Sequence, residues 1–387
     1  MDRREFLRWS AAGFCGVTLG PAFWRNAYAQ PATPGPSPYG PISAFPDGNG
    51  LRLPAGFTSR VIATTGKSVE NTVYPWHPLP DGGACFAMSD GGWAYTSNSE
   101  TPVAGGASMV RFDPWANIVD ARRILVGTSV NCAGGPTPWG TWLSCEEWDR
   151  GMVWECYLDG LAAQPRPALG VFTHEAAALD PRHGLVYLTE DEPDGRFYRF
   201  VPSAWPSLDS GQLQAAQVIW DDERHLAGQV KWQRGPAEFS ARFWPNSERT
   251  TPFRGGEGCW YDGGFVYFST KGDNRVWSYD HRGKRLEVIH DPIVHPNSPL
   301  SGVDNVTVSK SRDIYVAEDG GDMQICLITP PPNRIVAAFL ELEEHDGSEI
   351  TGPAFNPAGD RLYFSSQRGV NNEGIGMTFE VRGPFRG

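Results

Sequence analysis

A short strand-like pattern recurs six times along the chain, and its spacing constrains the fold more than any other feature. The copies are centred on Tyr95, Leu143, Tyr187, Tyr267, Tyr315 and Tyr363. Successive centres are 48, 44, 80, 48 and 48 residues apart. A period in the forties, built from short β-type runs, is typical of a β-propeller with one repeat per blade. We therefore expect an all-β chain that forms a six-bladed β-propeller in a single domain.

The step of 80 residues between Tyr187 and Tyr267 predicts an insertion between blades. It exceeds the usual step of 48 by 32 residues, and residues 202–252 are richer in charge and weaker in strand signals. A missed seventh blade is the alternative, but this stretch lacks the Tyr motif. Runs such as Pro80-Asp81-Gly82-Gly83 and Asp262-Gly263-Gly264 are typical of turns between strands. We place the propeller at residues 53–387.

The N-terminus predicts export. Arg3-Arg4 opens a twin-arginine pattern that continues through Arg8, and Ala27-Tyr28-Ala29 supplies a cleavage site, which makes residues 1–29 a signal peptide. An amphipathic N-terminal helix is the alternative. Residues 30–52 are rich in Pro and Gly and are expected to be an exposed leader. The protein would pass through the Tat translocase in folded form and become periplasmic or secreted.

The net charge, the hydropathy and the cysteine content limit the kinds of partner and metal site that the chain can have. The formal net charge of −12 argues against nucleic acid and is compatible with multivalent cations. No apolar stretch after residue 30 is long enough to span a bilayer, so we expect no membrane span in the mature protein. We also expect the protein to be a monomer. Six cysteines remain after cleavage and none forms a CxxC pair, which excludes a zinc ribbon. We expect most of them to be buried, apolar-like residues.

Candidate site residues follow from the hairpin geometry. In an antiparallel hairpin, the start of the first strand and the end of the second lie at the same edge. In each repeat these two places carry acidic side chains, with a thiol, a His and an Asn among them. Candidate metal ligands are therefore Cys132, Glu146, Glu147, His174, Glu175, Asp191, Glu192, Glu257, Asp304, Asn305, Glu318 and Asp319. Candidate catalytic cations at the same edge are Arg254, Lys271 and Arg368.

The chemistry of this set favours cations. Crowded carboxylates repel one another unless cations neutralise them. Oxygen-rich clusters suit calcium, whereas a thiolate mixed with carboxylates and a His suits a transition ion such as iron. Each residue also has a simpler interpretation. Carboxylates at strand ends can be solvated turn residues, Cys132 and His174 can be core residues, and the three cations can be surface charges that bind nothing. Beside a cation cluster, the same Arg and Lys side chains would suit a phosphate.

Three segments carry a resemblance to a known family. They are residues 131–147 (Asn-Cys-Ala-Gly-Gly to Cys-Glu-Glu), residues 174–177 (His-Glu-Ala-Ala) and residues 189–192 (Thr-Glu-Asp-Glu). They are similar to the PhoX-type alkaline phosphatases and their short relatives, and the similarity runs from about Leu53 to the C-terminus. The twin-arginine leader is also typical of that family. The resemblance implies a six-bladed propeller with an axial cluster of Fe(III) and Ca²⁺ around a bridging oxo group.

The resemblance also implies roles for individual residues. Cys132 would be the thiolate ligand of iron, with Glu147 or Glu146, Glu175 and Glu257 as its carboxylate companions. The calcium candidates would be Asp191, Glu192, Asp304 and Glu318. Arg254 would face the phosphate. This chain is shorter than the best-known members of the family, so insertions over the entrance of the site are in doubt.

Three functions remain open at this stage. The first is an exported metal-dependent phosphatase that acts on small phosphomonoesters. The second is a calcium-dependent lactonase or esterase, because six-bladed propellers host several hydrolytic chemistries. The third is a non-catalytic binding module, with Trp76, His77 and Trp260 lining its site.

Overall fold

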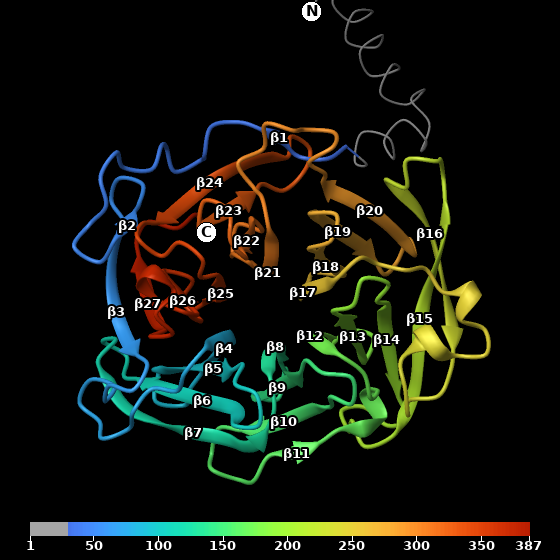
Figure 1. Ribbon diagram of the computed structural model, residues 1–387, viewed down its shortest axis with the longest axis horizontal. Helices are drawn as coiled ribbons and strands as arrows, with labels where there is room; N and C mark the ends of the chain where they lie inside the picture. The colour runs from blue at the N-terminus through green and yellow to red at the C-terminus, as the bar shows by residue number, and fades with distance from the viewer. Residues whose placement is uncertain (1–29) are drawn as a thin grey trace, which may run out of the picture.

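The computed structural model describes residues 30–387, whose β-sheets form a propeller-like ring around a central axis (Figure 1). This confirms the all-β, propeller-like class. Within residues 30–387 the only helices are four 3₁₀ turns, and none is long and apolar enough to cross a membrane. The 3₁₀ turns are η1 (Pro167–Leu169), η2 (Ala241–Phe243), η3 (Ser247–Arg249) and η4 (Val370–Asn372). The predicted signal peptide, residues 1–29, lies outside the described residues.

The repeating unit is a four-stranded antiparallel meander, and the motif strand is its second strand from the axis. Each predicted hairpin therefore continues into two outer strands. The first meander is β4 (Pro80–Ala87), β5 (Trp93–Ser99), β6 (Gly105–Phe112) and β7 (Ile118–Thr128). The second is β8 (Asn131–Pro136), β9 (Thr141–Glu146), β10 (Val153–Tyr157) and β11 (Gln164–Pro165). The third is β12 (His174–Asp180), β13 (Leu185–Glu190), β14 (Phe197–Pro202) and β15 (Gly211–Trp220).

The other three meanders follow the same plan. The fourth is β17 (Gly256–Asp262), β18 (Phe265–Thr270), β19 (Arg275–Asp280) and β20 (Arg285–His290). The fifth is β21 (Val303–Val308), β22 (Ile314–Glu318), β23 (Gln324–Ile328) and β24 (Ile335–Leu342). The sixth is β25 (Ile350–Phe355), β26 (Arg361–Ser366), β27 (Met377–Arg382) and, from the start of the chain, β3 (Thr58–Thr64). The pairing of β3 with β27 closes the ring by joining the two ends of the chain.

Residues 30–52 run along the outside of the fifth meander (Figure 1). They contribute β1 (Thr33–Pro34), which is parallel to β24, and β2 (Leu51–Arg52), which is antiparallel to it. Ala32 and Leu51 are fully buried, while much of the segment between them is exposed.

The segment predicted as an insertion, residues 202–252, contains more regular structure than its composition suggests. Its first part is β15, whose residues Leu213, Ala215 and Val218 are buried. The chain then adds β16 (Ala227–Arg234), which pairs with both β15 and β20 and joins the third and fourth meanders into one nine-stranded sheet. Turns η2 and η3 lie in the remaining loop.

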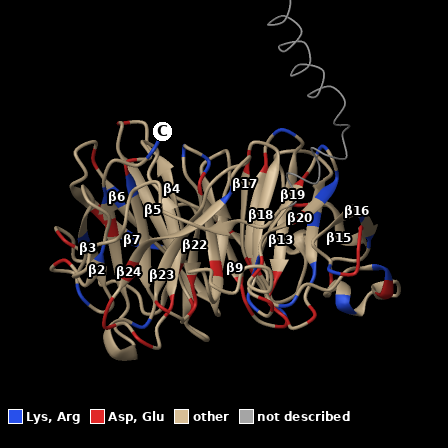
Figure 2. Cartoon of the chain, turned by 90° about the horizontal axis from the view of Figure 1, so that it is seen from above, with Lys and Arg blue, Asp and Glu red and all other residues tan. Residues whose placement is uncertain are grey.

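The core lies between neighbouring meanders, and the motif strands supply much of it. Successive residues of a strand point to opposite faces of its sheet, so Tyr95 packs against the sixth meander while Ala94 packs against the second. The same alternation buries Tyr187 against Phe268 of the fourth meander. Figure 2 shows the strands running from one face of the ring to the other, with many of the charged residues in the loops at both faces.

Candidate metal centre

The inner hairpins bring their ends to one face of the ring. Asn131 at the start of β8 is paired with Glu146 at the end of β9, and Val303 at the start of β21 with Glu318 at the end of β22. The innermost strands of the six meanders lie side by side around the axis, each packed against the next (Figure 1). We call the end of the axis where these strands begin the axial mouth.

Every innermost strand has a β-bulge close to the axial mouth. The pairing register shifts between Asn131 and Gly134, and between Val303 and Val306, and the other four inner hairpins shift at a matching place. A bulge inserts one extra residue and re-aims a side chain, and such bulges are common beside active sites. In five of the strands a potential ligand stands at the first bulge position: Asp81, Cys132, Glu175, Glu257 and Asp304.

Small residues next to the bulges allow the inner strands to approach one another closely. A Cβ on Gly135 would lie 1.8 Å from the carbonyl oxygen of Ala177, and one on Gly258 would lie 2.5 Å from the backbone nitrogen of Val306. Gly352 occupies the bulge of the sixth meander with a φ of +60°, and a Cβ there would lie 2.7 Å from the Asp81 carbonyl oxygen. Larger residues would push the strands apart and would disperse the side chains at the mouth.

A second set of side chains comes from the residue that follows each second strand. These residues are Glu100, Glu147, Asp191, Lys271, Asp319 and Gln367. The four acidic residues of this set, the five bulge ligands and Glu349 define what we call the axial cluster: Asp81, Glu100, Cys132, Glu147, Glu175, Asp191, Glu257, Asp304, Asp319 and Glu349.

The cluster contains three groups whose ligand atoms all lie within 4.8 Å of one another. These groups are Glu175 with Glu257 and Asp304, Cys132 with Glu100 and Glu147, and Asp81 with Glu100 and Glu349. Because Glu100 belongs to two of these groups, the Cys132 group and the Asp81 group are contiguous. The third group lies near enough for the Glu175 charge to raise the pKa of Cys132.

Burial and mutual repulsion raise the pKa values of the most deeply buried carboxyls of the cluster. Burial is the larger cause for Glu175, and the carboxylates of Glu257, Glu147, Asp304 and Asp81 raise its pKa further. The same two causes raise the pKa of Asp81 to about 7 and that of Glu257 to about 8. Without cations, the cluster therefore holds protons at neutral pH that solvated carboxyls would release.

Glu175 provides the clearest evidence that the cluster is built for a cation. Both of its carboxylate oxygens are buried and have no hydrogen-bond partner. A buried polar group without a partner costs free energy, so native proteins rarely leave one unsatisfied. The Cys132 thiol is also buried, and burial, followed by the charges of Asp81 and Glu175, raises its pKa. A bound cation would reverse this effect, because metal ligation favours the thiolate. The donor set thus fits the iron and calcium that the resemblance implies.

Two predicted cations border the cluster and a third lies farther out. Lys271 Nζ is 2.6 Å from Asp191 Oδ2 and 2.8 Å from Glu257 Oε1. Although burial disfavours its charge, these carboxylates raise the pKa of Lys271. Arg368 Nη1 is 3.0 Å from Glu349 Oε1. Arg254 is exposed, and its backbone carbonyl accepts a hydrogen bond from the Gly272 amide.

Several predicted ligands have structural partners instead of a place in the cluster. Glu146 accepts hydrogen bonds from the Ser129 and Met152 amides and from Trp154 Nε1. Glu318 accepts from the amides of Ser301 and Gln324. Each is the last residue of its strand and stands one position before the side chain at the mouth. Because successive side chains of a strand point to opposite sides, Glu146 and Glu318 point into their own meander.

The other three such residues also act within the fold. His174 stacks on Phe172, and its Nε2 is 3.0 Å from the Gly170 carbonyl oxygen. Glu192 forms an ion pair of 2.9 Å with Arg242. Asn305 accepts a hydrogen bond from the Gly352 amide and donates one to Asp304 Oδ1, so it fixes a cluster carboxylate without joining the cluster.

Asp81, Glu100 and Glu349 are cluster residues that the sequence analysis missed. The run Pro80-Asp81-Gly82-Gly83 looks like a turn but forms the start of β4. Its glycines serve the close packing of strands, since a Cβ on Gly82 would lie 2.4 Å from Ala133 Cα. Gln367 Nε2 donates to Asp81 Oδ2 and also to Glu100 Oε2, which links the two carboxylates. Glu100 stands five residues after its motif centre, whereas its counterparts stand four after theirs. An acidic residue just after the motif strand was the available signal, although it is displaced by one position.

The residues considered for a binding module are mostly internal. Trp76 is buried and donates through Nε1 to Thr378 Oγ1. His77 is buried against Ser108, and burial lowers its pKa well below the ordinary value. Trp260 lines the axial cavity beneath the bulges. The expectation that Trp76 and His77 line an open site is therefore wrong.

Comparison with protein families identifies the relatives of this fold. The model described as "Alkaline phosphatase PhoX" matches residues 94–159 and 158–292, which together make up just over half of the chain. The chain belongs to the PhoX alkaline phosphatase family. This membership makes it a phosphoric monoester hydrolase by family. The matched residues include Glu100, Cys132, Glu147, Glu175 and Glu257 of the axial cluster.

Solved structures show the same fold. Pseudomonas fluorescens PhoX, in complex with vanadate as a transition-state analogue, superimposes with a TM-score of 0.71 at 16% identity, covering 89% of this chain and 97% of that one. A gluconolactonase from Xanthomonas campestris gives a TM-score of 0.51 at 12% identity, covering 92% and 98%. No curated protein matches this chain in sequence.

Proposed function

We propose that this PhoX-family chain is an exported phosphatase that hydrolyses phosphomonoesters with the help of iron and calcium held by the axial cluster. The observation that carries the proposal is the convergence of a thiol and many carboxylates at the axial mouth, where Glu175 has two buried oxygens without partners. The likeness to a PhoX structure that binds a phosphate transition-state analogue supports the same reaction class.

We also propose that the ring is best counted as six blades. The nine-stranded sheet is two meanders joined only through the additional strand β16. Six hydrophobic clusters occur among the described residues, and each lies mainly between two neighbouring meanders, including one between the third and fourth. A blade is a sheet packed face to face on its neighbours, so the core packing supports six.

Ligand chemistry divides the cluster between two kinds of cation. A thiolate favours a transition ion, which assigns iron to the side of Cys132, Glu147 and Glu175. The all-carboxylate groups around Asp81, Glu349 and Asp304 favour calcium, which takes oxygen ligands. The chemistry that bound cations supply is polarisation of the phosphoryl oxygens and stabilisation of the charge that develops on them.

The basic residues of the mouth would hold the phosphate itself. Lys271 keeps its proton because Glu257 and Asp191 raise its pKa, so it can donate hydrogen bonds to phosphoryl oxygens throughout the reaction. Arg368, half-buried beside Glu349, offers a second donor, a planar guanidinium that follows the second strand of the sixth meander. Because Arg254 is exposed, it would contact the substrate only from the rim of the mouth.

Export in a folded state agrees with the cysteines. All six described cysteines are free thiols, and five of them are buried. The fold therefore needs no disulfide, and it can form, with its cations, before translocation. The twin-arginine pattern at Arg3 and Arg4 remains the sequence basis for this part of the proposal.

The test is phosphate release from an aryl phosphate at alkaline pH by mature protein, with and without chelation. We expect release that a calcium chelator abolishes and that calcium restores. Inactive protein with a full complement of iron and calcium would refute the proposed reaction.

A lactonase is the second candidate, because the gluconolactonase fold also matches with a TM-score of 0.51. Hydrolysis of gluconolactone with a single divalent ion per chain and no iron would favour it. The dense carboxylate cluster around a thiol favours the phosphatase.

A further inference from the structure

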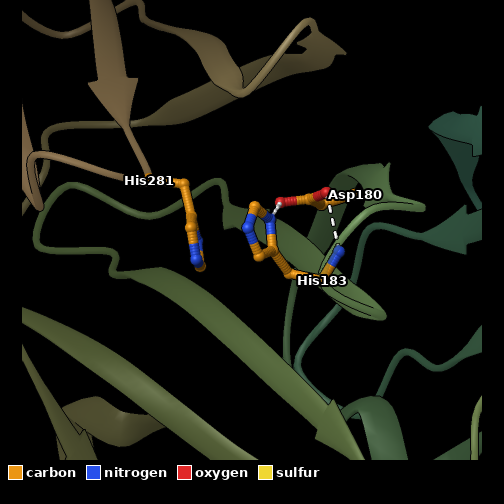
Figure 3. Close-up of side chains that lie close together, drawn as sticks. All are labelled: Asp180, His183 and His281. Atoms are coloured by element: carbon orange, nitrogen blue, oxygen red, sulfur yellow. Dashed lines mark hydrogen bonds and ion pairs between the residues drawn. The ribbon is translucent and has the colours of Figure 1, made fainter.

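A second group of metal-ligating side chains lies on the face opposite the axial mouth (Figure 3). Asp180 ends β12, and His183 stands in the turn that leads to β13. His281 stands in the turn between β19 and β20. Because β12 and β19 begin at the mouth, both turns lie at the far face. The group therefore joins the third meander to the fourth, well separated from the axial cluster.

Contacts with buried groups hold the three side chains close together. His183 Nδ1 is 2.7 Å from Asp180 Oδ2, and Asp180 is fully buried. The rings of His183 and His281 are stacked, with centroids 3.9 Å apart and an angle of 22° between their planes. His281 Nδ1 is 2.8 Å from the hydroxyl of Tyr187, which is also fully buried. Figure 3 shows the two imidazole rings facing each other beside the carboxylate.

The electrostatic surroundings favour a neutral imidazole at His281, beside the Asp180 carboxylate. Burial, and next the neighbouring His183, lower the pKa of His281, so its ring is a ready ligand at neutral pH. Asp280 adds a second negative charge nearby. Arg199 opposes a cation, but its guanidinium donates to Gln214 and lies over the Trp232 ring, 4.5 Å from its centroid. Arg182 follows Asp180 in the turn and is another cation at the rim.

We propose that Asp180, His183 and His281 form a binding site for a divalent transition-metal ion such as Zn²⁺. One ligand atom from each residue already lies within 4.8 Å of the other two. Zinc bonds of about 2.0–2.2 Å to nitrogen and oxygen place ligand atoms roughly 3.3 Å apart, so contraction by about 1.5 Å is needed. His183 is 44% exposed and can rotate toward the ion, while Asp180 stays fixed.

Ligand type separates this site from the axial cluster. Two imidazole nitrogens with one carboxylate suit zinc, nickel, copper or cobalt, whereas calcium prefers oxygen ligands alone. Tyr187 holds Nδ1 of His281 and leaves its Nε2 free as a ligand, which is a common arrangement at protein metal sites. Rotation of His183 would release the Asp180 carboxylate from Nδ1 so that both can bind the ion. The ion would link two turns that are not otherwise bonded, and it would stabilise the contact between the third and fourth meanders.

The experiment measures zinc in the mature, iron- and calcium-loaded protein in the presence of saturating calcium. The wild type should bind one more zinc ion per chain than the double variant His183→Ala/His281→Ala. Zinc at about 100 times its Kd should raise the thermal midpoint of the wild type by about 3 °C or more, and this rise should be absent from the double variant. Cobalt should give the visible bands of a nitrogen-ligated site only in the wild type.

Two controls keep the test decisive. His295→Ala removes an imidazole elsewhere on the surface and should leave the zinc count unchanged, and Cys132→Ser should keep the difference of one zinc between wild type and double variant. Equal zinc content and equal midpoint shifts in the wild type and the double variant would overturn the proposal. The single variant His281→Gln, which keeps a polar side chain beside Tyr187, covers the case in which the double variant does not fold, and it should also lose the zinc.

Discussion

Glu175→Gln is the substitution that most sharply separates a cation site from an ordinary buried acid. Its magnitude follows from the raised pKa of Glu175 in the metal-free protein. A folded-state pKa above the unfolded value of 4.5 means that stability present at low pH is lost as pH rises toward the folded pKa. Each pH unit in that interval removes up to about 1.4 kcal/mol.

The variant removes this loss but leaves an amide without partners, which costs about 1–3 kcal/mol. Relative to metal-free wild type, metal-free Glu175→Gln should therefore gain up to about 1.4 kcal/mol of stability for each pH unit between about pH 5 and pH 8, and it should show no gain near pH 5. With iron and calcium present the order should reverse, because the variant loses a ligand.

Urea unfolding at both pH values, with and without metals, measures all four differences. Glu155→Gln is the matched control, since the buried Glu155 carboxylate is satisfied by Arg166, Trp139 and Thr141. It should destabilise the protein with or without metals. If Glu175→Gln behaves like this control, the interpretation of Glu175 as a cation ligand is refuted.

The other predictions concern neighbouring side chains with different roles. Cys132→Ser should lose iron and keep calcium, as measured by elemental analysis. Simultaneous loss of both metals would argue against the assignment of iron and calcium to different ligands. Glu147→Gln should lower metal content, whereas the adjacent Glu146→Gln should lower the free energy of unfolding by about 1–3 kcal/mol with metals retained, because Glu146 holds three N–H donors. Lys271→Met should reduce kcat/KM on an aryl phosphate about 10–100-fold, or about 1.4–3 kcal/mol, at unchanged metal content; an unchanged kcat/KM would remove Lys271 from the phosphate site.

The repeat spacing predicted the all-β propeller-like ring and the face at which the hairpin ends meet. It did so because one strand pattern per repeat fixes which strands are inner, and antiparallel pairing then fixes which ends lie together. The closing strand β3 was not predicted, since it comes from the opposite end of the chain and lacks the motif. The extra strand β16 was hidden by the charges that its exposed face carries.

The same reasoning could not separate ligands from structural acids one residue apart. Glu146 and Glu147 differ only in the side of the strand they occupy, and that side depends on where pairing ends. The bulge that aims Cys132 and Asp81 at the axis leaves no local sequence signal beyond small residues, which also mark turns. Glu349 precedes its strand and is placed by a β-bridge to Asp319 of the fifth meander and by the Gln367 amide, which donates to its carbonyl oxygen.

The most direct test of the central claim is a crystal structure of the mature protein with anomalous data collected at the iron edge. We expect iron bound by Cys132 Sγ and by oxygens of Glu147 and Glu175, and calcium among Asp81, Asp304 and Glu349. An axial mouth in which iron and calcium are absent from a catalytically active protein would contradict the account.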